Sequence, residues 1–228
     1  LLGVCESASM LGYNVLITTS NAHDISELQS LVESNRVDGM LLTRALEDDR
    51  ALQYLSQANF PTALTGTCRY DNIIQVDTDN EGAAEKMTTL LIGKGFRRFA
   101  FLVKDMSYNV DRKRHEGFCR ALIKNGISEK DQLFYNGSIR MEFLDAIIEN
   151  IISKKVECIL CGDDEICTMV MSRLQAEGYR IPKDVAIASL YNSTNLDCYS
   201  PAVTAVSVAA SQMGGTAVRQ LIQRLRGE

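Results

Sequence analysis

Three cysteines in the second half of the chain are the first residues whose spacing suggests a particular chemistry. Cys158 and Cys161 form a Cys-x-x-Cys pair, and Cys167 follows shortly afterwards. Such spacing is typical of zinc sites and of redox-active thiols. The pair falls on a predicted strand, however, where residues three apart point to opposite faces, and a structural zinc ion needs four converging ligands. We therefore predict no metal site.

Motifs that would identify an enzyme are absent from the sequence. It contains no glycine-rich phosphate loop, no Gly-x-Ser-x-Gly elbow and no His-Glu-x-x-His pair. The histidines are His23 and His115, so His23 has one possible histidine partner for a metal, and a catalytic centre would have to rest on carboxylates. We predict no catalytic residue, no cofactor and no enzymatic activity. The alternative, an enzyme on a flavodoxin-like sheet, would be supported by turnover of a metabolite.

Polar residues that follow predicted strands are better candidates, for ligand binding rather than for catalysis. They are Ser20, Asn21, His23, Asp77, Asp79 and Asp163. In open α/β sheets, ligands bind at the carboxyl ends of parallel strands, which is where these side chains fall. Asp77 and Asp79 either reach a ligand or cap the helix that follows, and capping is the favoured role of Asp79. Asp163 has the same alternative role as a helix cap.

The spacing of apolar residues predicts the elements that position these side chains. Short β-branched runs alternate with longer segments of helical spacing, as expected for strand–helix units around a parallel sheet. Strands are predicted over 14–19, 39–43, 62–65, 73–76, 98–103, 132–135, 157–161, 185–190 and 204–208. Helices are predicted after Asp24 and over 48–58, 81–92, 110–125, 141–153, 165–177 and 211–225.

Several residues also predict where helices begin and end. Asp24 and Glu27 resemble a capping box at a helix start. Five residues are predicted to end helices, because glycine and asparagine tolerate the left-handed conformation found there. They are Gly12, Asn35, Gly95, Gly126 and Gly178.

The first residues of the sequence predict a helix rather than a strand. Leu1, Val4, Cys5, Ala8 and Leu11 share one helical face. A parallel strand–helix architecture ordinarily opens on a strand, so we expect a strand, central to the first sheet, to precede this sequence. Without it, the strands on either side of its place would lack ladder partners.

Composition narrows the class of protein. With 46% apolar residues, the 228-residue chain can bury one large core or two modest ones. The net charge of −5 is opposite to the basic surface that DNA binding requires, so this sequence is not expected to bind DNA alone. An odd number of cysteines, seven, favours a reducing cytoplasm. No apolar run is long enough to span a membrane, and the first residues lack the order of an export signal.

Five blocks of sequence, in order along the chain, resemble the LacI/GalR family of bacterial transcriptional regulators. They are VDTDNEGAA at 76–84 with LIGKGFRRFAF at 91–101, RHEGF at 114–118, CGDDE at 161–165, IPKDV at 181–185, and Pro201 to Thr204 followed by Met213-Gly214. One such block alone would be a weak signal, but five in register are specific. The resemblance covers nearly the whole chain.

The resemblance implies a fold of the type I periplasmic-binding-protein class. This is an α/β fold with two doubly wound parallel-sheet subdomains joined by three crossovers, and a small ligand between them. We expect an N-terminal subdomain of residues 1–103 and 207–228, and a C-terminal subdomain of residues 104–206.

The resemblance also implies ligand contacts. Arg114 matches the ligand-gripping arginine of the family, and its planar guanidinium suits paired hydroxyls or a carboxylate. Its alternative is a solvated place in the basic run 112–114. Asp163 occupies a position where the family commonly has asparagine and is expected to point into the cleft. Residues 20, 21 and 23 are expected to line one wall.

One loop departs from the family pattern. Many sugar-responsive members read Gly-Phe-Asp-Asp after a strand, where this chain reads Ser-Leu-Tyr-Asn-Ser at 189–193. The aspartate that grips sugar hydroxyls is missing, which puts a simple hexose or pentose in doubt. Tyr191 could instead donate a hydrogen bond or stack on an apolar ring face, or it could be an ordinary loop residue.

The implied function is that of the effector-sensing domain of a DNA-binding regulator. A small polar metabolite, such as a sugar or sugar derivative, would close the cleft and shift the N-terminal subdomains of a homodimer relative to each other. Operator binding by a helix-turn-helix headpiece absent from this sequence would then change. The main alternative is a periplasmic solute-binding protein that serves a transporter or chemoreceptor. The seven cysteines and the blocks around Asp77 and Arg114 favour the regulator, whereas an export leader in the full gene would favour the alternative.

Overall fold

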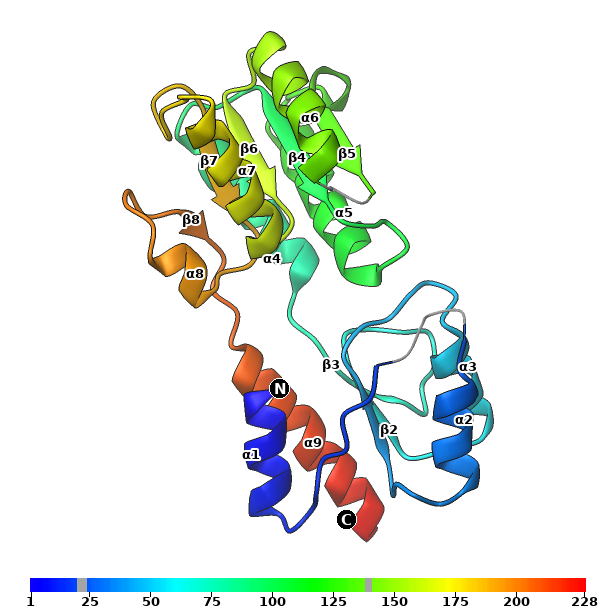
Figure 1. Ribbon diagram of the computed structural model, residues 1–228. Coiled ribbons are helices and arrows are strands. Elements are labelled where there is room, and N and C mark those ends of the chain that lie inside the picture. Colours follow the sequence, from blue (N-terminus) through cyan, green and yellow to red (C-terminus); the bar gives the residue numbers. More distant parts are fainter. Residues whose placement is uncertain (20–23, 138–140) are drawn as a thin grey trace. The chain divides into compact units, whose positions relative to one another are not determined.

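The computed structural model describes residues 1–19, 24–137 and 141–228 and divides the chain into two compact units (Figure 1). Unit 1 comprises Leu1–Thr78 and Ala209–Glu228, and unit 2 comprises Asp79–Val208. The first boundary therefore lies earlier than the predicted residue 103. The reason is that strand β4 (Phe99–Val103) pairs with β5 (Leu133–Asn136) and β6 (Cys158–Cys161), so that it belongs to the sheet of unit 2.

Unit 2 is built on a five-stranded parallel sheet of order β5-β4-β6-β7-β8, which confirms the predicted α/β class. Strand β7 spans Ala186–Ser189, and β8 spans only Thr204–Ala205, shorter than the predicted 204–208. Strands β4, β6 and β7 are buried at every residue. Helices cover both faces of such a sheet, so its central strands have continuous apolar sequences instead of alternating ones.

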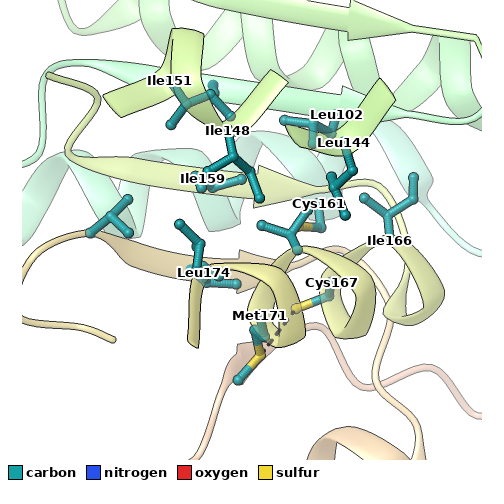
Figure 2. Close-up of a cluster of buried hydrophobic side chains, with 14 of the residues drawn as sticks. Leu102, Leu144, Ile148, Ile151, Ile159, Cys161, Ile166, Cys167, Met171 and Leu174 are labelled. Atoms are coloured by element: carbon teal, nitrogen blue, oxygen red, sulfur yellow. Dashed lines mark hydrogen bonds between the residues drawn. The ribbon is translucent and has the colours of Figure 1, made fainter. Parts of the chain in front are cut away.

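Alternate residues of these strands face two separate helical layers. Helices α4 (Asn80–Gly93) and α5 (Asn109–Lys124) cover one face, where Phe101 and Leu160 lie. Helices α6 (Met141–Ser153) and α7 (Asp164–Ala176) cover the other face. Figure 2 shows this second cluster, in which Leu144 and Ile148 of α6 pack with Ile159 of β6. The core of unit 2 fixes the strand ends that carry the candidate site.

Unit 1 contains a three-stranded parallel sheet of order β1-β2-β3 among its described residues. The strands are β1 (Met40–Leu42), β2 (Thr62–Thr65) and β3 (Ile74–Val76). The helices are α1 (Leu2–Met10), α2 (Ser26–Glu33), α3 (Arg50–Gln57) and α9 (Ala210–Arg226). Helix α9 packs on the sheet through Ala217 and Leu221. Helices α1 and α9, from opposite ends of the chain, lie side by side (Figure 1).

The predicted strand at 14–19 is wrong, because these residues have no assigned strand pairing. Val15, Leu16 and Ile17 are 38%, 61% and 59% exposed. Within the described residues β1 pairs with β2 alone. A β-branched run becomes a strand only where a partner satisfies its backbone groups, and no described strand lies beside this one.

Helix ends follow the sequence closely, with one difference. The five predicted stop residues, at 12, 35, 95, 126 and 178, all have positive φ angles. Asp24 accepts a hydrogen bond from the backbone N–H of Ser26 at 3.0 Å, so the predicted capping box with Glu27 is not formed. Two short helices were not predicted, η1 (Glu129–Asp131) and α8 (Thr194–Asp197).

In the described ranges, no helix combines the length and apolar content needed to cross a bilayer.

Candidate functional site

The candidate site of unit 2 lies where strands β4, β6 and β7 end and α5 passes close by. Lys104 follows β4, Gly162 and Asp163 follow β6, and Tyr191 comes two residues after β7. Arg114 reaches the same strand ends from α5. The carboxyl ends of parallel strands are the usual place for ligands in open α/β sheets, so the topology supports the predicted location.

Arg114 is buried rather than solvated. Only 8% of the residue is exposed, and its Nη1 donates a hydrogen bond to the carbonyl oxygen of Gly162 at 2.7 Å. A guanidinium cannot be deprotonated in a protein, so a buried arginine stays charged. Hydrogen bonds such as this one offset the cost of burying that charge. The alternative of a solvated side chain in the basic run 112–114 is therefore excluded. Ligand contact by Arg114 stays a prediction.

Asp163 has the capping role that was considered as its alternative. Its Oδ1 accepts a hydrogen bond from the backbone N–H of Ile166 at 2.9 Å, which caps the amino end of α7. Its Oδ2 lies 2.9 Å from Nζ of Lys104. The side chain therefore joins the end of β6 to the end of β4. Its contact with a ligand stays a prediction.

Lys104 is a site residue that the sequence analysis missed. Its ammonium group lies 2.5 Å from Oε2 of Glu165, in addition to its contact with Asp163. Burial acts to lower the pKa of Lys104, but the two carboxylates outweigh it, so that its pKa lies above the ordinary value. Lys104 directly follows the predicted strand 98–103, so the rule that selected Asp163 would also have selected Lys104.

Asp111 is a second missed residue, one turn before Arg114 on α5. It is 7% exposed, and its Oδ2 accepts the backbone N–H of Asp105 at 3.1 Å. Burial raises the pKa of Asp111, whereas the Asp105 N–H, Arg114 and Lys104 act in the opposite direction. The signal for it in the sequence was helical spacing, because positions three apart share a helix face.

Tyr191 is half-buried on a turn held by Ser189. The hydroxyl of Ser189 donates to the carbonyl oxygen of Tyr191 at 2.7 Å and accepts the Tyr191 N–H at 3.3 Å. The next residue, Asn192, donates its backbone N–H to Val206 at 2.8 Å. The backbone of this turn is thus fixed next to the end of β7, and the role of the Tyr191 phenol stays a prediction.

The remaining predicted contacts come from the first part of the chain. Asp79 accepts the Gly82 N–H at 2.8 Å and caps α4, which confirms its favoured role. Asp77 is half-buried and accepts the Thr78 N–H at 2.8 Å. Ser20, Asn21 and His23 lie outside the described residues.

The cysteines follow the strand geometry that was predicted for them. Cys158 lies in the core beneath α4 and α5, whereas Cys161 lies in the core beneath α6 and α7, so the two thiols are on opposite faces of the sheet. Cys167 packs with Cys161 and contacts Met171 (Figure 2). All seven cysteines are free thiols. In the part of the chain that the structure describes, no three His, Cys, Asp or Glu side chains form a group that could hold a metal ion.

Comparison with known protein families matches residues 88–228 to the periplasmic binding protein-like domain. The match covers more than half of the chain, and the chain belongs to this family. The fold agrees with it, because two units with parallel sheets carry their candidate residues at strand ends.

Within that family, the chain is an effector-sensing domain of the LacI-regulator type. It is 27% identical to the HTH-type transcriptional regulator CelR of Thermobifida fusca, over all of this chain and 69% of CelR. It is 25% identical to catabolite control protein A of Staphylococcus xylosus, over 99% of this chain and 70% of that protein.

Solved structures agree with these relatives. A putative LacI transcriptional regulator from Bacillus cereus subsp. cytotoxis superposes with a TM-score of 0.91 at 28% identity, over 99% of this chain and 82% of the other. A complex of the regulator CelR with cellobiose superposes with a TM-score of 0.87 at 27% identity, over 99% of this chain and 71% of the other. These similarities favour a regulator over the solute-binding alternative.

Proposed function

We propose that this chain senses a small, polar, hydroxyl-bearing metabolite on behalf of a transcriptional regulator, with Arg114, Asp163 and Tyr191 as ligand contacts. The observation that carries the proposal is the convergence of Arg114 and Asp163 on the ends of β4 and β6, where one bonds to Gly162 and the other to Lys104. The relative solved with cellobiose supports a sugar or sugar derivative as the effector.

The proposal includes contacts from the first part of the chain. Asp77, Ser20, Asn21 and His23 are proposed as further ligand contacts, with Asp79 acting mainly as a cap. Hydroxyl groups both donate and accept, so a polyhydroxylated ligand can use carboxylate, amide and guanidinium partners together.

The proposed output is a change in DNA binding. We infer that the chain works in a homodimer whose operator contacts come from a helix-turn-helix headpiece outside this sequence. A coupling free energy of about 1–3 kcal/mol between ligand and operator would change operator affinity by about 5- to 150-fold. The relatives are transcriptional regulators rather than enzymes, and we propose that this protein acts in the cytoplasm without turning over its ligand.

A thermal-shift screen tests ligand binding. Sugars, sugar phosphates, sugar acids and nucleosides are added to the wild type, to Arg114→Lys and to a matched surface control, Lys94→Ala. Lys94 is exposed at the end of α4. A binding compound should raise the midpoint of the wild type and of the control, and raise that of Arg114→Lys much less relative to its own baseline. Equal stabilisation of all three proteins would show that Arg114 is not in the binding site.

A gel-shift experiment tests the regulatory output. The product of the complete gene is titrated onto its own upstream DNA with and without the compound found in the screen. The proposal expects ligand to change the DNA affinity within the range given above. An unchanged affinity, or chemical conversion of the compound by the purified protein, would contradict it.

A further inference from the structure

We propose that the carboxylates of Asp111 and Asp163 make this site select uncharged, hydroxyl-bearing ligands and exclude their phosphorylated and acidic derivatives. The inference rests on the proposed function, because it concerns the ligand of the same site. It goes beyond it by assigning a specificity role to Asp111, whose side chain is one helical turn from Arg114.

The first step is the state of the two cations at the strand ends. Lys104 is held by Asp163 at 2.9 Å and by Glu165 at 2.5 Å. Arg114 is 8% exposed, donates to Gly162 and attracts the charge of Asp111. Both cations therefore already have carboxylates beside them, so neither is a ready binding group for an incoming anion.

The second step is the balance of charge. Asp111, Asp163 and Glu165 carry three negative charges, whereas Lys104 and Arg114 carry two positive ones. The cluster is therefore acidic. Asp111 accepts the backbone N–H of Asp105, the residue after Lys104, at 3.1 Å, which places its carboxylate at the end of β4. Its charge there interacts with those of Arg114, Asp163 and Lys104. Asp105 and Asp164, at the same strand ends, add further negative charge. Arg112 and Lys113 stand on other faces of α5, because positions one and two residues from Asp111 are rotated around the helix.

The third step is how a ligand meets this cluster. Asp111 is 7% exposed, so water screens its charge less than it screens a surface carboxylate. A phosphate or carboxylate on a ligand would be repelled by the excess negative charge. A hydroxyl would not, because it can donate to the free lone pairs of Asp163 and accept from a cationic neighbour. Two carboxylates held against two cations thus favour neutral hydroxyl groups.

Inorganic phosphate is the probe that tests this selectivity without knowledge of the natural ligand. Backbone amide shifts of residues 104, 111, 114, 162 and 163 are followed by NMR during titration with phosphate, at constant ionic strength. The proteins are the wild type, Asp163→Asn, and the double variant Asp111→Asn/Asp163→Asn. Asparagine keeps the shape of aspartate and is an equally good helix cap, so the capping of α7 is retained. Asp131→Asn, in the exposed η1 helix before β5, is the control.

We expect no saturable phosphate binding in the wild type or in Asp131→Asn. In the double variant we expect saturable binding, tighter by about tenfold or more than any residual binding in the wild type, because its cluster has lost two negative charges. Asp163→Asn should lie between the two, and it carries the test if the double variant loses the dispersed spectrum of a folded protein.

Two results would overturn the inference. Phosphate binding by the wild type as tight as by the variants would show that the carboxylates exclude nothing. Binding in none of the proteins would show that something other than these carboxylates keeps anions out. Neither result bears on the coupling between ligand and DNA. Conversely, a gel shift that fails to respond to ligand would leave the phosphate titration unaffected. Failure of this inference can therefore be distinguished from failure of the proposed function.

Discussion

Nη1 of Arg114 donates to the carbonyl oxygen of Gly162 at 2.7 Å, and this bond joins helix α5 to the carboxyl end of β6. The two residues are far apart in the sequence, and each lies next to another part of the site. Gly162 precedes Asp163, and Arg114 follows Asp111 by one turn. The bond therefore fixes two sides of the candidate site relative to each other.

Loss of this bond should destabilise unit 2. Arg114→Ala removes the donor to the buried carbonyl oxygen of Gly162 and one of the two cations that stabilise the charge of Asp111, which should lower the free energy of unfolding by about 1.5–3 kcal/mol. Urea unfolding followed by circular dichroism measures the change. The exposed control Lys94→Ala should stay within about 0.5 kcal/mol of the wild type. Equal effects of the two substitutions would contradict the structural role of Arg114.

Gly117 should tolerate no side chain, because α5 and α4 approach each other closely there. A Cβ at Gly117 would stand 2.1 Å from the carbonyl oxygen of Glu81 and 3.0 Å from Cβ of Ala84. We expect Gly117→Ala to cost about 1–3 kcal/mol of stability or more, since the helix backbones must separate. The comparison variant is Gly93→Ala, at the end of α4, where a Cβ meets no atom within 4 Å. It should be neutral or gain up to about 1 kcal/mol, and a loss as large as that of Gly117→Ala would refute the close approach.

The ion pair of Asp184 with Arg180 should appear in an acid titration. Hydrogen bonds from the Arg180 side chain and backbone lower the pKa of Asp184 to about 2. A carboxyl whose folded-state pKa is depressed adds stability above its unfolded pKa of about 3.9, and this stability is lost as the pH falls towards the folded value. The carboxylate is exposed, so salt should weaken the effect.

Carboxyl-carbon NMR titration measures this pKa directly. In Arg180→Gln, the pKa of Asp184 should return towards its ordinary value of 3.8. An unchanged pKa in that variant would show that Arg180 is not its cause. The same titration of Asp131→Asn is the control and should leave the pKa of Asp184 unaltered.

Thiol reactivity should follow burial. Burial raises the pKa of Cys158 to about 12 and that of Cys161 well above the ordinary value, whereas Cys198 is exposed. Iodoacetamide reacts with the thiolate, so under native conditions Cys198 should be alkylated first and Cys158 and Cys161 only after unfolding. Mass spectrometry of peptides at successive times gives the order. Labelling of Cys158 as fast as Cys198 would place this thiol outside the core.

Much of the fold follows from the sequence because two of its signals act locally: the pattern of apolar residues along a strand, and the glycine or asparagine residues that end helices. Strands β4, β6 and β7 were predicted from short apolar runs, and all three are buried at every residue. The stop residues at 12, 35, 95, 126 and 178 were predicted from the conformational freedom of glycine and asparagine, and all have positive φ. The opposite placement of Cys158 and Cys161 followed from the alternation of side chains along a strand.

The tertiary structure decided those features that depend on a partner far away in the chain. Residues 14–19 have the composition of a strand but do not form one. A strand needs a neighbouring strand that pairs with its backbone groups, and no described strand pairs with these residues. The run 112–114 reads as a solvated basic segment, yet Arg114 is buried because β6 ends beneath it at Gly162. Lys104, Asp111 and Asp163 lie apart in the sequence and form one charged cluster only when β4, α5 and β6 pack together. The sequence determines which residues can bear charge, and packing determines which of those charges meet.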